Sequence, residues 1–270
     1  MAASERSLVT VCSARPDGAT SVAVGLAAVL SQTSRVLLVD LCQHGSEVAP
    51  LLDVEDSPNV YELSFLARLA PVSANELECH VQWRDGLGVL AGIWPAPGQR
   101  EEITDVFVEG LVSTAASRFD HVVVDLGRPR PALPSALASG ALVWVVSPSP
   151  LGMAALDRTV AGLKEQQAAW LQSTSVVLNR VDERSWRDVE RLIELEYGMR
   201  VVGKLPLADE CWRALERQHS IAPFSVPVLD RKRHRRAYGS DSWRTRQALE
   251  ELAQAVLPER PAIVAAALEV

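Results

Sequence analysis

Short apolar runs alternate with helix-length segments along most of this chain, and no other feature limits the fold as strongly. Nearly continuous Val, Leu and Ile runs are typical of strands that are buried on both faces of a parallel sheet. The strand candidates are Leu8–Cys12, Val36–Asp40, Leu87–Ala91, His121–Leu126, Leu142–Ser147, Ser175–Asn179 and Val201–Leu205.

Segments with helical periodicity separate these strands. Strand followed by helix, repeated along the chain, predicts a doubly wound α/β fold with a mostly parallel sheet and helices on both faces. We expect one domain over residues 1–257 and a tail, 258–270, that forms either a short helix or no fixed structure. The helix candidates are Thr20–Gln32, Asn59–Leu69, Ile103–Ser117, Met153–Leu171, Ser185–Tyr197, Asp209–Gln218 and Ser242–Val256.

Composition excludes several classes of protein. A formal net charge of −7 argues against binding nucleic acid through bulk charge. No apolar stretch approaches the roughly 20 residues that span a bilayer, and the N-terminus lacks the pattern of a signal peptide, so we expect a cytoplasmic protein. The four cysteines contain no C-x-x-C pair and predict mostly buried thiols rather than a zinc site or disulfides. They are Cys12, Cys42, Cys79 and Cys211.

The first strand leads into a glycine-containing turn and a long Ala/Val/Leu helix, which is the setting of a phosphate-binding loop. The usual pattern is G-x-x-x-x-G-K-[ST]. Here the same spacing gives Ser13-x-x-x-x-Gly18-Ala19-Thr20, so the hydroxyl and the second glycine are present and the lysine is not. An alternative interpretation is a helix start in which Asp17, Gly18 and Thr20 are ordinary turn and cap residues.

Polar residues also follow other strands at the same expected edge of the sheet. Asp40 and Asp125 each end an apolar strand, and together beside the loop they predict a shared Mg²⁺ site. Asn179 ends a third strand. For all three residues the alternative is a side chain that only stabilises the following turn.

The order of these segments resembles the ParA/MinD group of P-loop ATPases, and within it the CpaE/TadZ-like branch, which localises pilus-assembly machinery. The resemblance covers roughly residues 7 to 256 and implies a three-layer P-loop NTPase-like fold. The matching segments are LVTVCSARPDGATSVAVGLAAVLSQ, RVLLVDLCQHGSEVAPLLD, LGVLAGIWPAPGQREEI, FDHVVVDLGRP, LVWVVSPSPLGMAALDRTVAGL, VVLNRVD and VVGKLPLAD.

The resemblance implies roles for particular residues. It places the magnesium ion at Thr20, Asp40 and Asp125, and an adenine contact at Asn179. The family's two loop lysines fall at Ala14 and Ala19, and the acid that positions the attacking water falls at Cys42. The implied nucleotide-binding residues are Ser13, Arg15, Gly18, Ala19, Thr20, Ser21 and Asn179.

These replacements predict the loss of catalysis, because phosphoryl transfer depends on cations that neutralise the transferring group. Arg15 is the one cation in the loop that could substitute, and Asp17 opposes it by placing a negative charge where phosphates would lie. The expected cofactors are ATP and Mg²⁺ with weakened affinity, or none. The leading hypothesis is a non-catalytic, dimeric scaffold that recruits a partner of a localisation, pilus or secretion assembly. The alternatives are a slow ATP-dependent dimerisation switch and a DNA-associated partition protein.

One local patch runs against the acidic character of the chain. The run from Arg231 to Arg236 carries five cations in six residues. It predicts either a solvated loop or a site for DNA phosphates, anionic lipid or an acidic partner. The residues of this basic run are Arg231, Lys232, Arg233, Arg235 and Arg236. The tryptophans Trp94, Trp144, Trp170, Trp186 and Trp212 are expected in the core or at its rim.

Overall fold

All seven predicted strands lie in one sheet in the computed structural model, which describes residues 7–43, 45–92, 103–182, 186–207, 213, 215, 217, 220–221, 224 and 242–257. Their order across the sheet is β3-β4-β2-β5-β1-β6-β7-β8. Every neighbouring pair is parallel except β3 with β4. The strands are β1 Ser7–Cys12, β2 Val36–Asp40, β3 Gln82–Arg84, β4 Leu87–Leu90, β5 His121–Gly127, β6 Ala141–Val146, β7 Thr174–Val181 and β8 Arg200–Pro206.

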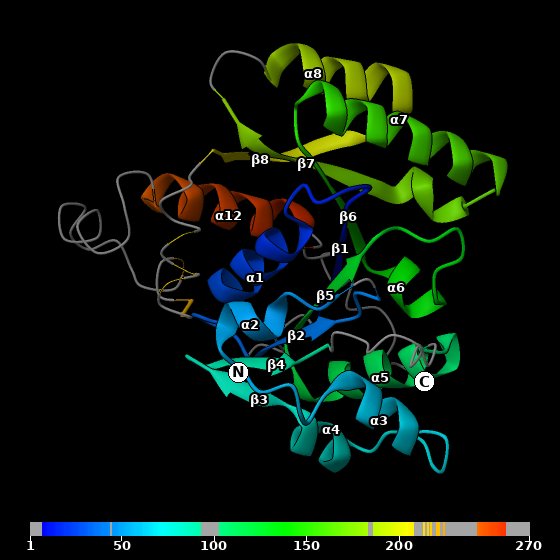
Figure 1. Ribbon diagram of the computed structural model, residues 1–270, viewed down its shortest axis with the longest axis vertical. Coiled ribbons are helices and arrows are strands. Elements are labelled where there is room, and N and C mark those ends of the chain that lie inside the picture. Colours follow the sequence, from blue (N-terminus) through cyan, green and yellow to red (C-terminus); the bar gives the residue numbers. More distant parts are fainter. Residues whose placement is uncertain are drawn as a thin grey trace, which may run out of the picture.

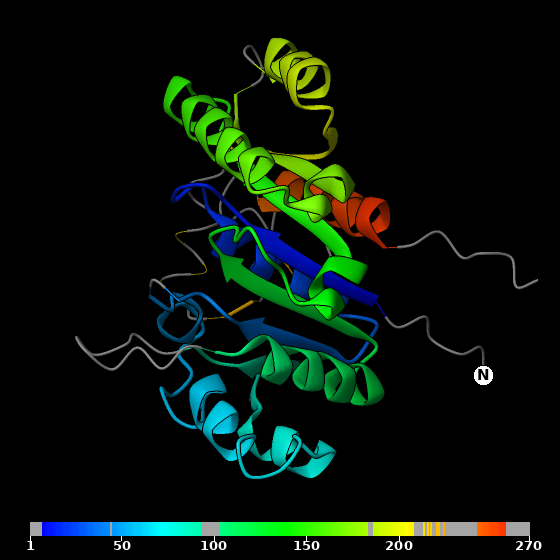
Figure 2. The same cartoon turned by 90° about the vertical axis from the view of Figure 1, so that its right-hand side faces the viewer.

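Helices cover both faces of this sheet, so the predicted α/β class is confirmed. Helices α1 and α12 lie on one side, and α5, α6 and α7 lie on the other (Figures 1 and 2). The α-helices are α1 Ala19–Leu30, α2 Val48–Leu52, α3 Val60–Leu66, α4 Ala74–His80, α5 Asp105–Arg118, α6 Ser135–Ser139, α7 Pro150–Glu165, α8 Trp186–Leu192 and α12 Ser242–Val256.

The core is divided into two layers because successive side chains of a strand point to opposite faces. In β2, Leu37 and Val39 join the cluster under α5 and α7, whereas Val36 and Leu38 join the cluster under α1 and α12. Both faces of the central strands are therefore buried, which explains why their sequences are continuous apolar runs rather than alternating ones.

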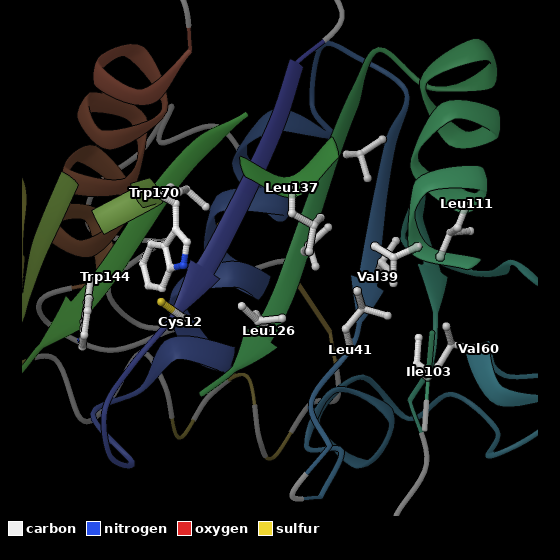
Figure 3. Close-up of a cluster of buried hydrophobic side chains, with 14 of the residues drawn as sticks. Cys12, Val39, Leu41, Val60, Ile103, Leu111, Leu126, Leu137, Trp144 and Trp170 are labelled. Carbon is white, nitrogen blue, oxygen red and sulfur yellow. The ribbon is translucent and has the colours of Figure 1, made fainter. Parts of the chain in front are cut away.

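Two tryptophans lie in the first of these layers, as predicted. Trp144 and Trp170 are buried with their ring centroids 6.4 Å apart, and Cys12 lies beside them (Figure 3). The side chains of Trp94, Trp186 and Trp212, which were also predicted in the core or at its rim, fall outside the described residues. The cysteine prediction holds for Cys12 but is wrong for Cys79, which is exposed on α4.

The main differences from the predicted elements have local causes. The predicted helix Met153–Leu171 is instead α7 followed by a 3₁₀ helix, Ala169–Ser173, because Gln167 adopts a left-handed φ of 54° that ends the α-helix. The short elements α2, α4, α6 and β3 were not predicted. Strand β3 forms a hairpin with β4 through Asp85 and Gly86, which both have positive φ, as two-residue hairpin turns require.

Candidate functional site

The loop between β1 and α1 ends in a left-handed glycine, and no side chain caps the helix that follows. Gly18 is the residue before α1 and has φ 91°, a left-handed value that favours glycine. No side chain caps α1, and its first turn contains no acid. The N–H groups at the start of α1 therefore point to a site where an anion can bind. Gly18 is the N-cap residue of α1, as the capped-helix alternative has it, but no side chain caps the helix.

Neighbouring strands hold the loop in place. The Ser13 N–H donates to the carbonyl of Gly127, the last residue of β5, at 2.8 Å, and the Ser13 hydroxyl donates to the Arg15 carbonyl at 2.7 Å. On the other side, the Asn179 amide of β7 donates to the Asp17 carbonyl at 2.7 Å. The loop is therefore anchored to strands on both sides of β1.

Asn179 acts here as a support for the loop. It is 2 % exposed, and its side-chain oxygen accepts a hydrogen bond from the Arg180 N–H at 2.9 Å. A Cβ atom at Gly18 would lie 2.5 Å from the Asn179 Nδ2 atom, so this contact adds a second reason for glycine at that position. The adenine contact implied by the resemblance stays a prediction.

The Asp17 side chain of this loop is buried. It is 3 % exposed and faces Ser147 after β6 and Arg180 of β7, and burial raises the pKa of its carboxyl. The Arg15 Nε atom lies 3.8 Å from the Asp17 carboxylate. The effect of the Asp17 charge on a bound phosphate stays a prediction, and Arg15 already faces this acid of its own loop.

Asp40 and Asp125 are brought together as the sequence predicted. They face each other in the register of β2 and β5, and both are fully buried. One oxygen of each carboxylate stabilises the following turn: Asp40 accepts from the Cys42 N–H at 2.9 Å, and Asp125 accepts from the Gly127 N–H at 3.0 Å. The alternative, in which each side chain stabilises the following turn, is thus correct for one oxygen of each carboxylate.

The other two carboxylate oxygens differ from each other. The Ser46 hydroxyl donates to Asp40 Oδ2 at 2.6 Å. Asp125 Oδ2 is buried and accepts no hydrogen bond from the described residues, while the Thr20 hydroxyl faces the same carboxylate. A buried carboxylate oxygen without a partner beside a hydroxyl is a site that fits a hard cation. Within the described residues, no group of three or more His, Cys, Asp or Glu side chains could hold a metal ion by itself.

Burial raises the pKa of both carboxyls. The pKa of Asp40 rises to about 7, first through burial and then through repulsion by Asp125. Burial raises the pKa of Asp125 to about 6, and the Thr20 hydroxyl and the Gly127 N–H oppose this rise. A divalent cation would favour the ionised form of both groups.

The Cys42 side chain packs closely against Gly127. A Cβ atom at Gly127, which has φ 68°, would lie 2.5 Å from the Cys42 sulfur. Gly92, after β4, is similarly close to Asp40, because a Cβ atom there would lie 2.8 Å from the carboxyl carbon. Both glycines allow the loops at this edge to approach the two acids closely.

Comparisons with known proteins identify the family. A sequence profile for the CobQ/CobB/MinD/ParA nucleotide binding domain matches residues 18–221. The chain belongs to this family. No match was found among curated proteins.

Solved structures of family members share the fold of this chain. A ParA family ATPase from Chlorobium tepidum TLS superposes with a TM-score of 0.67 at 18% identity, covering 93% of this chain and 99% of that chain. The MinD protein from Pyrococcus horikoshii OT3, complexed with Mg-ADP, gives 0.63 at 17% identity, with 93% and 95% covered. A putative plasmid partition protein from Borrelia burgdorferi B31, bound to AMPPNP, gives 0.65 at 15% identity, with 93% and 98% covered. This confirms the P-loop fold of the ParA/MinD type.

The remaining predicted residues are placed as follows. Ala19 is the first residue of α1 and is buried, Thr20 and Ser21 follow it half-buried, and Ala14 packs against the core layer that contains Cys12. The basic run lies outside the described residues. Within the described part of the chain, no helix is both long and apolar enough to span a bilayer, as predicted.

Sequence reasoning missed four residues of this site: Ser46, Gly92, Tyr61 and Arg130. Tyr61 of α3 lies near Asp40, Cys42 and Arg130, and burial followed by the charges of Asp40 and Cys42 raises the pKa of its hydroxyl. No local signal marks Ser46 or Gly92. Arg130 could have been noticed, because it stands between two prolines a few residues after the buried Asp125.

Proposed function

We propose that this ParA/MinD-type protein binds a nucleotide with reduced affinity, does not hydrolyse it, and acts in the cytoplasm as a CpaE/TadZ-like pseudo-ATPase scaffold. The observation that carries the proposal is the combination of a preserved loop with Ala19 at its lysine position. Such a protein would recruit or position a partner, and pilus or secretion machinery is the partner class that the resemblance favours.

Nucleotide binding is supported by the groups that remain. The uncapped start of α1 offers N–H donors and the positive end of the helix dipole to a phosphate. Thr20, Asp40 and Asp125 would hold a magnesium ion, which supplies charge neutralisation between the outer phosphates when bound. Ser13, Gly18 and Asn179 keep the loop in shape before any ligand arrives.

Hydrolysis is opposed by the groups that are missing. Ala14 and Ala19 carry no charge for the transition state, and Cys42 carries no carboxylate to position water. Arg15 is a poor substitute because its guanidinium lies beside the buried Asp17. A loss of this kind costs several orders of magnitude in rate.

Assembly with a protein partner is known for one solved relative. The MinD protein of Aquifex aeolicus has been solved as a MinC:MinD complex, at 16% identity and a TM-score of 0.62 to this chain. We propose a homodimer that presents a surface to a protein partner in the same general way.

The first prediction is that the purified protein hydrolyses ATP no faster than a buffer blank with Mg²⁺. Phosphate release over hours at saturating ATP measures this directly. Thr20→Ala is the control, because it removes a magnesium ligand of the site and should leave the background rate unchanged. Mg²⁺-dependent turnover that Thr20→Ala abolishes would disprove the pseudo-ATPase proposal.

Phosphate release together with sedimentation tests the first alternative, a slow dimerisation switch. That alternative requires a dimer that forms with ATP and dissociates after turnover. Sedimentation with ATP, with ADP and without nucleotide separates it from a scaffold whose oligomeric state does not follow the nucleotide.

The second prediction concerns the basic run and the DNA-associated alternative. If Arg231, Lys232, Arg233, Arg235 and Arg236 bind DNA, the affinity should fall steeply with salt, with a logarithmic slope of about −4 to −5 for five phosphate contacts. Fluorescence anisotropy with a DNA duplex at increasing salt gives the slope. Replacing all five with alanine should abolish binding, since the chain is otherwise acidic. Binding that survives the five substitutions would place recognition on another face.

A further inference from the structure

The loop after β5 holds an arginine in a fixed position at the edge of the nucleotide site. Arg130 stands between Pro129 and Pro131, and the proline rings restrict the backbone on both sides of it. The indole N–H of Trp170 donates to the Pro131 carbonyl at 3.0 Å. This hydrogen bond ties the loop to the buried tryptophan pair beneath it (Figure 3).

A second anchor lies a few residues further along. The Glu109 carboxylate of α5 accepts hydrogen bonds from the Ser135 hydroxyl at 2.7 Å and from the Ala136 N–H at 3.1 Å. Glu109 thereby caps the start of α6. With Gly127 bonded to Ser13 at the other end, the loop is held at three points around Arg130.

The Arg130 side chain is half-buried and leaves one of its donors without a partner among the described residues. Its Nε atom is buried and makes no hydrogen bond to any described residue. Buried polar atoms normally have a partner, and a lone N–H of a guanidinium is costly to leave unpaired. Its electrostatic neighbour is Tyr61, which also lies near Asp40 and Cys42. Tyr61 therefore links Arg130 to Asp40, one of the two buried acids.

The charges of the site explain why a cation is needed there. Asp40 and Asp125 are buried, Glu47 lies near Asp125, and the loop offers no lysine. A terminal phosphate brought beside these acids would add negative charge that only the proposed Mg²⁺ would oppose. Arg15 faces Asp17, whereas Arg130 has a buried Nε atom with no partner among the described residues and shares the neighbour Tyr61 with Asp40 and Cys42.

We propose that Arg130 is the phosphate-binding cation of this site and contacts the terminal phosphate of a bound nucleoside triphosphate from the side opposite the loop. The inference rests on the proposed nucleotide binding. The planar guanidinium can donate two parallel hydrogen bonds to a phosphate, which a lysine cannot do. Arg130 would thus distinguish a triphosphate from a diphosphate in a site that has lost its lysines.

The test compares Arg130→Ala with Arg128→Ala, an exposed arginine of the same loop that serves as the matched control. Affinities for ATP, ADP and AMP are measured with Mg²⁺ by calorimetry or with fluorescent analogues. Arg130→Ala should weaken ATP binding by about 10-fold or more and ADP binding by less than about 3-fold. Arg130→Lys should recover part of the loss, and Arg128→Ala should change neither affinity by more than about 2-fold.

Other outcomes separate the two proposals. If the wild-type protein binds none of the three nucleotides, the proposed function fails and the role of Arg130 fails with it. If it binds ATP and Arg130→Ala leaves the ratio of ATP to ADP affinity unchanged, only the role of Arg130 is disproved. Should Arg130→Ala fail to fold by circular dichroism, Arg130→Lys and Arg130→Gln carry the test, and an unchanged ratio in both overturns the inference.

Discussion

Replacing Ala19 with lysine is expected to tighten ATP binding by roughly 10- to 100-fold, because a lysine at the start of α1 would form charge-assisted hydrogen bonds with the outer phosphates. Ala19 is followed directly by Thr20, so the new ammonium group and the magnesium-side hydroxyl would act on the same phosphates. Titration of wild type and Ala19→Lys with a fluorescent ATP analogue and Mg²⁺ measures the gain.

Ala19 is buried, so the extra bulk must be separated from the extra charge. Ala19→Met is the matched control, since it adds a chain of similar length with no charge. Only Ala19→Lys should gain affinity. Equal behaviour of the two variants, or no gain in either, would mean that the loop is closed to phosphate or that its alignment with the lysine position is wrong.

The same lysine should not restore turnover by itself. Cys42 still lacks the carboxylate, so water would not be positioned for attack. The double variant Ala19→Lys/Cys42→Asp is expected to show hydrolysis above background where neither single variant does. The Cys42 sulfur already fills the space beside Gly127, so Cys42→Asp alone is the control for whether the new carboxylate is tolerated there. Activity in Ala19→Lys alone would show that Cys42 is not the decisive loss.

The sheet could be predicted from sequence because burial on both faces imposes a composition on its strands. Leu37 and Val39 enter one core layer and Leu38 the other, so no polar residue is tolerated in between. The hairpin strand β3 escaped prediction because Gln82 and Arg84 are polar edge residues, although the Asp85-Gly86 turn beside them was a usable signal.

The sequence predicted the position of a site residue only where an acid stands at the end of an apolar strand. Asp40 and Asp125 follow apolar runs, and a parallel sheet must bring such ends to one edge. The direction of the Asp17 carboxylate could not be inferred, because it depends on Ser147 and Arg180 from distant segments. The position of Arg130 similarly depends on Trp170 and Glu109, whose contacts arise only when the chain folds.

The last prediction is that the free energy of unfolding falls as the pH rises from about 4 to about 7 because of the Asp40 and Asp125 pair. Burial raises both pKa values, to about 7 and about 6, above those of the unfolded chain. The folded state therefore binds protons more tightly than the unfolded state, and stability is lost as the pH rises through the folded pKa values. The expected loss is on the order of 1–3 kcal/mol in the absence of Mg²⁺ and nucleotide.

Denaturant titrations of wild type and Asp125→Asn at pH 4.5, 6 and 7.5 isolate this contribution from that of other carboxyls. Asp125→Asn removes one member of the pair and its repulsion of Asp40, so the difference in unfolding free energy between the two proteins should shift in favour of the variant as the pH rises. Asp188→Asn, at an exposed aspartate of α8, should run parallel to wild type. Mg²⁺ with ATP at pH 7.5 should stabilise wild type more than Asp125→Asn, because the cation compensates the negative charge that both carboxylates carry at this pH. Parallel curves for wild type and Asp125→Asn would show that these acids do not share a proton-sensitive site, and would remove the physical basis for placing the cation there.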